Sequence, residues 1–262
     1  GAIYFKGKDV TRDIEKAKRY YSLAAQKNIP SSLYNLGVMY EKKSSDQRNL
    51  RTAMNYYTLV SDQNHPEALF RLGLMYEEGK YIDRDIHKAM VYYMKASNKK
   101  NEKAQFRLGL IYARGNHVQR NINKAIYYFK LAAESRHANA RYYLGSIYYE
   151  GLYVDYDIEK AIHYFKEASN LLNQFAKNNL GIIYKTGRGV QANPSGSIVY
   201  FEEAIRQKKD PVAMFNLAHI YFYEEAGISN LNEAIKLLVK SAISQTIYAL
   251  DLLCLSVIKN YS

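Results

Sequence analysis

The sequence contains no tryptophan, one cysteine and four prolines among its 262 residues. One cysteine, Cys254, excludes an internal disulfide framework and favours a reducing compartment. We therefore expect an intracellular, cytoplasmic protein. Four prolines are too few for a linker-rich or disordered chain. Long hydrophobic runs are also missing, since the longest apolar stretch, residues 247–258, contains Asp251 and is too short to span a bilayer.

Acidic residues are scarce relative to basic ones. The chain has 25 Asp and Glu against 37 Lys and Arg, a formal net charge of +12. This excess favours an acidic partner, a nucleic acid or an anionic surface without deciding among them. Hydrophobic residues make up 48% of the chain, so it can still bury a sizeable core. Tyrosine is abundant, with 27 residues.

Five columns of residues recur along the chain with a period of 36 residues. Leu-Gly occurs at 36/37, 72/73, 108/109, 144/145 and 180/181, and a tyrosine follows three residues after each glycine. A small residue recurs before an aromatic pair, at Ala17, Ala53, Ala89, Ala125, Ala161 and Ser197. A further glycine recurs at Gly7, Gly79, Gly115, Gly151 and Gly187. Several columns that share one period indicate a repeat protein.

Each period predicts two helices, which we call helix A and helix B. Ala68, Leu72 and Tyr76 lie on one face of a helix A, which Gly79 ends. An Asp or Asn stands four residues before each small residue, where the N-cap of helix B belongs: Asp13, Asn49, Asp85, Asn121, Asp157, Asn193 and Asn230. One pair cannot bury its apolar face alone, so neighbouring pairs must stack into a solenoid.

The glycine of the Leu-Gly column needs a physical reason. Inside a helix it costs about 1 kcal/mol relative to alanine. We expect it to allow close approach of the paired helices, with Gly109 facing the small Ala125 and with Leu108 and Tyr112 closing the space on either side.

Two alternating half-motifs resemble the Sel1-like repeats, longer relatives of the tetratricopeptide repeat. The first is "AQFRLGLIYARG" (104–115) and "ARYYLGSIYYEG" (140–151), and the second is "DIEKAIHYFKEA" (157–168). The 36-residue period exceeds the 34 residues of a tetratricopeptide repeat. The loop "GLYVDYD" (151–157) also favours the Sel1-like class.

These observations predict an all-α fold, a right-handed α-α superhelix of about six Sel1-like repeats in one array, residues 1–262. The expected boundaries are a partial repeat at 1–29, repeats at 30–65, 66–101, 102–137, 138–173, 174–210 and 211–246, and a terminal helix at 247–262. Gly1 falls in the Leu-Gly column and the terminal helix is too apolar for a cap, so we expect further repeats or a fused domain beyond either end. Lys43 replaces a loop glycine, so its turn is expected to be distorted.

Fragments of catalytic motifs are present but incomplete. Ser97-Asn-Lys-Lys100 and Lys185-Thr186-Gly187 match two elements of the penicillin-binding signature, whose third element is absent. The histidines have no metal-ligand spacing, and His65 and His137 share an inter-repeat turn position expected to be exposed. We therefore predict no enzymatic activity, no metal and no cofactor.

The A helices of such repeats are expected to line a concave groove. The candidate partner-binding residues on this face are Asn35, Phe70, Arg71, Phe106, Arg107, Tyr142, Tyr143, Tyr149, Asn179 and Asn216. Packing between repeats is the favoured interpretation for the aromatic ones. Arg71 and Arg107, in consecutive repeats, are expected to bind carboxylates or phosphates. A further column, Glu41, Glu77, Ala113, Tyr149 and Lys185, would grade the groove from acidic to aromatic to basic.

Four lysines at the start of helix B form a ladder: Lys16, Lys88, Lys124 and Lys160. They are either a solvated ridge, which charge patterning favours, or an anion-binding edge. The resemblance implies a non-catalytic scaffold or adaptor that binds an extended segment or helix of a protein partner. The alternative function is binding of RNA or an anionic membrane surface through the basic face.

Overall fold

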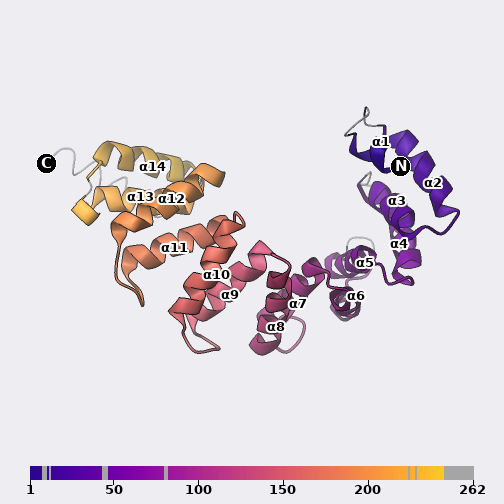
Figure 1. Cartoon of the computed structure of the whole chain (residues 1–262), viewed down its shortest axis with the longest axis horizontal. Helices are drawn as coiled ribbons and strands as arrows, with labels where there is room; N and C mark the ends of the chain where they lie inside the picture. Colours follow the sequence, from indigo (N-terminus) through magenta and orange to yellow (C-terminus); the bar gives the residue numbers. More distant parts are fainter. Residues whose placement is uncertain are drawn as a thin grey trace. The chain divides into compact units, whose positions relative to one another are not determined.

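The computed structural model describes residues 1–7, 11, 13–42, 47–79, 82–223, 225–227 and 229–244. Within these residues the chain forms α-helices and one short 3-10 helix, with no strand, so the predicted all-α array of helix pairs is confirmed. The chain divides into two compact units, residues Gly1–Ser135 and Arg136–Ser262 (Figure 1). The predicted terminal helix and the turn at Lys43 lie outside the described residues.

The first unit contains four helix pairs. Its helices are α1 (Ala2–Lys6), α2 (Ile14–Ala25), α3 (Pro30–Lys42), α4 (Gln47–Ser61), α5 (Pro66–Glu78), α6 (Ile86–Asn98), α7 (Glu102–Arg114) and α8 (Ile122–Glu134). Odd-numbered members are A helices and even-numbered members are B helices. Within this unit each helix packs on the next, and from α3 to α8 the closest packing is between the A and B helices of one repeat.

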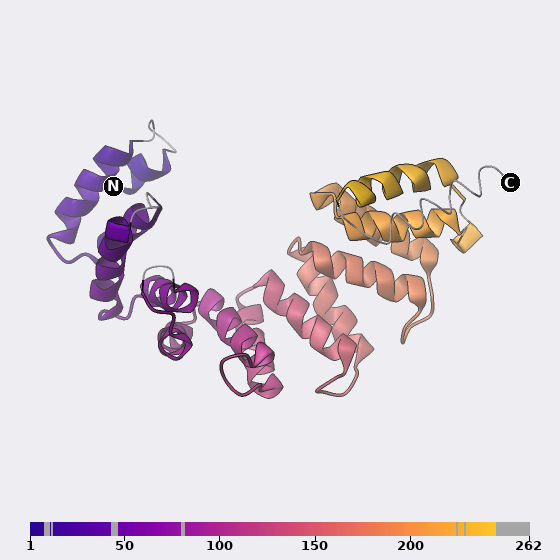
Figure 2. The same ribbon diagram turned by 180° about the vertical axis from the view of Figure 1, so that it is seen from behind.

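The second unit continues the pattern with three pairs. Its helices are α9 (Ala138–Glu150), α10 (Ile158–Asn170), α11 (Gln174–Thr186), α12 (Pro194–Lys208), α13 (Pro211–Phe222), the 3-10 helix η1 (Glu225–Gly227) and α14 (Leu231–Ile243). Both views show the partners of each pair lying side by side, as α9 and α10 do (Figures 1 and 2).

Six of the seven predicted helix-B caps are confirmed. In each, the Asp or Asn side chain accepts a backbone N–H of the first turn, as Asp85 Oδ1 does from Lys88 N at 2.9 Å. The prediction for Asn49 is wrong, because α4 already begins at Gln47 and contains it. The loop glycines end A helices as predicted, with the φ of Gly115 at 69°.

The A helices have caps of their own that the sequence analysis missed. His65 Nδ1 accepts from Ala68 N at 3.4 Å, and His137 Nδ1 accepts from Ala140 N at 3.1 Å. The expected exposure of these histidines is therefore wrong: both are half-buried. Asn101, Asn173 and Asp210 cap other A helices in the same way.

The nearest atoms facing the glycines of the Leu-Gly column belong to aromatic rings of helix B, where the sequence predicted Ala125 opposite Gly109. The alanine of that column also comes close at Gly73, where an added Cβ would lie 3.2 Å from Ala89 O. A Cβ on Gly109 would lie 2.5 Å from Cδ1 and Cε1 of Phe129. Gly73 stands against Tyr93 and Gly145 against Phe165 in the same way. The absent side chain admits the second ring of the aromatic pair, which is at most 6% exposed in six repeats: Tyr21, Tyr57, Tyr93, Phe129, Phe165 and Phe201.

The first ring of each pair forms a second recurring contact. Tyr92 stacks on Tyr76 of the preceding A helix with ring centroids 5.6 Å apart, and Tyr128 stacks on Tyr112 at 5.8 Å. The same stack recurs in four further repeats. Such parallel ring pairs add to the stabilisation from burial.

The last pair shows that glycine and ring size are coupled. Ala218 of α13 replaces the column glycine, and Leu238 of α14 replaces the buried ring. Both are fully buried in one apolar cluster. A smaller partner on helix B therefore leaves room for a Cβ on helix A.

Gly109→Ala is expected to destabilise the protein by about 1–3 kcal/mol, because overpacking against Phe129 outweighs the gain in helix propensity. Urea unfolding followed by circular dichroism measures the change. Phe129→Leu provides the matched background, since it reproduces the Ala218–Leu238 pair. In that background Gly109→Ala should cost little, and an equal cost in both backgrounds would contradict the ring contact.

Candidate partner-binding surface

All ten candidate partner-binding residues are half-buried, and each belongs to an A helix. Five lie in the first unit and five in the second. Phe70 and Phe106 each lie with the ring centroid 5.8 Å from the buried ring of their own repeat, Tyr93 and Phe129 respectively. These two rings therefore contribute to the core while leaving an edge exposed.

Arg71 and Arg107 belong to a bridge between consecutive repeats. Arg107 Nη1 lies 3.3 Å from Glu77 Oε1, and the buried Tyr93 donates its hydroxyl to Glu77 Oε2 at 2.6 Å. One repeat earlier, Glu41 joins Tyr57 and Arg71 in the same way. Burial, followed by the charge of Glu77, raises the pKa of Tyr93 far above its usual range, so the hydroxyl stays protonated.

This bridge accounts for the unusual arginines. The carboxylate that Arg107 was expected to bind is that of Glu77 in the same chain, which also accepts the hydroxyl of the buried Tyr93. Where the buried ring is Phe129, the position of Glu77 is taken by Ala113 and that of Arg107 by Tyr143. Between these repeats the three columns change together, as expected when a buried hydroxyl requires an acceptor. The first, partial repeat departs from this pattern, since Tyr21 keeps its hydroxyl with Phe5 in the glutamate column.

Glu77→Ala is expected to destabilise the protein by about 1–3 kcal/mol, since it leaves the Tyr93 hydroxyl buried without its acceptor. Adding Tyr93→Phe recreates the Ala113–Phe129 combination and should restore most of the loss. Chemical denaturation of the single and double variants measures both effects. A double variant as unstable as Glu77→Ala would show that the hydroxyl is not the cause.

The second unit carries an aromatic cluster that spans two A helices. The ring of Tyr142 lies 5.6 Å from that of Tyr143 and 5.8 Å from that of Phe175 at the start of α11. Phe175 is 54% exposed, although the sequence analysis did not select it. The same column holds Glu67, Lys103 and Asn139, and this switch from polar to aromatic was the available signal.

The remaining candidates have diverse partners. Tyr149 lies under the guanidinium of Arg188, whose Cζ is 4.6 Å from the ring centroid. Asn216 donates to Asn178 Oδ1 at 3.3 Å across two A helices, whereas Asn35 donates to Ser31 O within its own helix. Asn179 is half-buried in α11.

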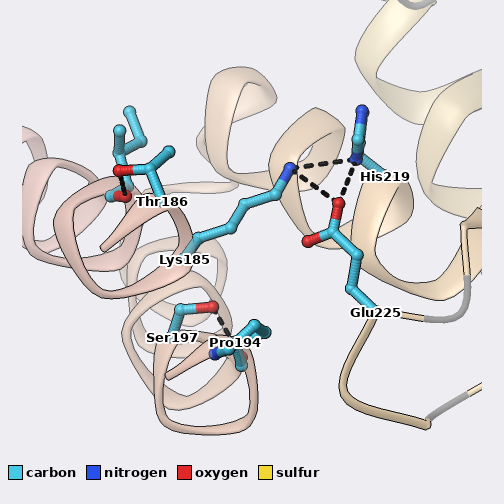
Figure 3. A network of polar contacts seen from close by, with 7 residues as sticks. Lys185, Thr186, Pro194, Ser197, His219 and Glu225 are labelled. Atoms are coloured by element: carbon cyan, nitrogen blue, oxygen red, sulfur yellow. Dashed lines mark hydrogen bonds and ion pairs between the residues drawn. The ribbon is translucent and has the colours of Figure 1, made fainter. Parts of the chain in front are cut away.

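A polar cluster joins α11, α13 and η1 at Lys185, His219 and Glu225 (Figure 3). Lys185 Nζ and Glu225 Oε1 each lie 2.9 Å from His219 Nδ1. An ammonium can only donate and a carboxylate only accept, so one imidazole nitrogen cannot serve both partners at once. Burial and then the charge of Lys185 lower the pKa of His219, while Glu225 opposes them.

This lowered pKa predicts a pH dependence of stability. Below the unfolded value of 6.5, the unfolded chain binds a proton on His219 that the folded chain resists, so the free energy of unfolding falls as the pH decreases. His219→Gln should flatten the decline measured by urea unfolding. His163→Gln is the matched control, because the His163 side chain is 67% exposed. An unchanged slope in His219→Gln would contradict the assignment.

The residues of the two catalytic-motif fragments, Ser97 and Lys185, make contacts that stabilise the helices. Ser97 is buried near the end of α6, and its carbonyl accepts from Gln105. Lys185 is engaged by His219 and Glu225. Among the described residues, no group of three or more His, Cys, Asp or Glu side chains is arranged to hold a metal ion. Nor does any helix there have the length and apolarity needed to cross a membrane.

Stacked helix pairs with a glycine–ring contact in every described repeat but the last define a helical-repeat protein of the tetratricopeptide-like class. The Sel1 repeat family model matches residues 1–29, 30–65, 66–101, 102–137, 138–171, 174–209 and 211–244. The chain belongs to the Sel1 repeat family. Proteins built from these repeats are generally non-catalytic scaffolds for protein–protein interaction.

Solved structures show the same repeat fold. The protein c5321 of uropathogenic Escherichia coli, described as a protective antigen displaying an SLR fold, is 26% identical with a TM-score of 0.85. The match covers 96% of this chain but only 54% of that protein. A Sel1 repeat protein from Oxalobacter formigenes is 25% identical with a TM-score of 0.74, covering 84% of this chain and 86% of that one.

A more distant likeness shows the fold alone. A chain of the APC/C hetero-tetramer Cut9–Hcn1 is 18% identical with a TM-score of 0.56, and the match covers 97% of this chain and 47% of that one. A search of curated proteins found no match.

Proposed function

We propose that this protein is a scaffold that binds an extended segment or helix of a protein partner along its A-helix face. The observation that carries the proposal is the aromatic cluster of Tyr142, Tyr143 and Phe175. Exposed aromatic rings held by a packed framework are typical anchors of protein interfaces.

Differences between the repeats support this assignment. The column contacts that build the core recur from repeat to repeat, whereas the A-helix face changes from the Glu–Arg bridges of the first unit to rings in the second. The side chain of Phe175 remains 54% exposed, and a partner that covers the A-helix face would bury it. The intracellular location stays a prediction based on the single cysteine.

Peptides selected from a random library of roughly 15 residues provide the test, because that length spans an extended groove. Tyr142→Ala should weaken the selected peptides by about tenfold or more, as expected for a buried aromatic anchor. Phe175→Ala should weaken them in the same direction. Fluorescence polarisation measures the dissociation constants.

The matched control is Tyr153→Ala, a tyrosine of the same unit that is 59% exposed in the loop between α9 and α10. It should leave the affinity within about twofold, as near-neutral contacts do. An equal loss of peptide affinity in Tyr153→Ala and Tyr142→Ala would contradict the assignment of binding to the A-helix face. The alternative function, binding of RNA or an anionic membrane, stays a prediction that rests on net charge.

A further inference from the structure

The positive charge of the chain is concentrated in one unit. Residues 1–135 carry 24 of the Lys and Arg against 13 Asp and Glu, a formal net charge of +11. Residues 136–262 carry 13 against 12, a net charge of +1. The two units share fold and repeat length, so the fold does not require this difference.

The excess is sharpest in the pair formed by α7 and α8. From Lys103 to Ala133, 31 residues contain no Asp or Glu and six Lys or Arg. The basic residues near the loop that joins the two helices are Arg114, Arg120 and Lys124, and all three are exposed. Their charges therefore reinforce one another, since the acidic residues of this pair stand at the opposite end from the loop, Glu102 at the start of α7 and Glu134 at the end of α8.

Backbone contacts fix two arginines at this edge. Arg120 Nε donates to Ala113 O at 2.9 Å, and Arg84 Nε of the preceding loop donates to Glu77 O at 3.0 Å. Arg84 Nη2 also lies 3.1 Å from His117 Nε2. A guanidinium can only donate, so the imidazole nitrogen accepts and Arg84 is held against the α7–α8 loop.

The corresponding edge of the second unit, at the loop between α9 and α10, has no arginine at the positions of Arg114 and Arg120. Glu150 stands where Arg114 does, and Tyr156 stands where Arg120 does. Lys160 retains the position of Lys124, and its Nζ pairs with Asp157 at 2.6 Å, whereas the cap beside Lys124 is the neutral Asn121. The lysine ladder therefore occurs in both units, whereas the cluster of Arg84, Arg114 and Arg120 belongs to the first unit.

We propose that the edge formed by Arg84, Arg114, Arg120 and Lys124 is a second docking surface, which binds an acidic segment of a protein partner. Charge complementarity carries the proposal, since carboxylates match both the pinned arginines and the adjoining lysine. The surface uses none of the ten candidate residues of the A-helix face.

The surroundings favour an acidic protein segment over other polyanions. Tyr112 already stacks on Tyr128 and lies beneath Lys124 Nζ at 5.1 Å, so the ring beside this edge does not offer the open stacking platform that single-stranded nucleic acids use. Residues 102–126 expose no large apolar side chain, and the exposed ring that follows, Tyr127, packs edge-on against Tyr128 with ring centroids 5.1 Å apart. Apolar insertion normally accompanies basic residues at membranes.

A fluorescein-labelled peptide of alternating Glu and Gly, about 12 residues long and thus up to ~40 Å when extended, is the probe. It should bind the full chain in low salt and weaken steeply as salt screens the charges. Arg114→Gln/Lys124→Gln should weaken binding by about fivefold or more, since two contributing charges are lost. Lys124→Gln alone should give a smaller loss in the same direction.

Lys160→Gln is the matched control and should change affinity by less than about twofold, because it removes the same ladder position without the arginines. Thermal unfolding checks that each variant is folded. Equal weakening by Lys160→Gln, or no peptide binding in low salt, overturns the proposal. Tighter binding of an oligouridine of equal length, or of phosphatidylserine vesicles, also overturns it. Tyr142→Ala should leave this affinity unchanged, which separates the result from the A-helix assignment.

Discussion

A glycine of helix A stands against a buried aromatic ring of helix B in every described repeat but the last, and this contact determines how closely the two helices approach. Gly109 against Phe129 is one of a series, and Ala218 with Leu238 shows the series adjusting when the ring is lost. The contact brings the two helices of a pair close together. It also fixes which face of helix B enters the core, since the second ring of each aromatic pair is the one that is buried.

The columns that recur supply the core, whereas the half-buried positions of the A helices differ from repeat to repeat. Tyr93, Glu77 and Arg107 link consecutive repeats by a satisfied buried hydroxyl, whereas the second unit places Tyr142 and Phe175 where they stay accessible. Function in this chain is therefore expected where the columns vary, and stability where they recur.

The period made the helix pairs, their loop glycines and most caps predictable, because each rests on local chemistry repeated in step. It does not reveal which two columns touch, so the sequence suggested Ala125 opposite Gly109 where the structure has Phe129. Glu77 and Arg107 are 30 residues apart in the sequence, so the period does not predict their ion pair. The cap formed by His65 could not be predicted, because histidine is an uncommon N-cap residue. Phe175 differs from the polar residues that occupy its column in the preceding repeats.

Hydrogen exchange of the full chain, with and without a selected peptide, tests whether packing within each pair leaves the A-helix face available to a partner. Bound peptide is expected to slow exchange in segments of α9 and α11, around Tyr142 and Phe175, with α10 and α12 changed much less. Protection confined to the B helices, with α9 and α11 unchanged, would contradict it.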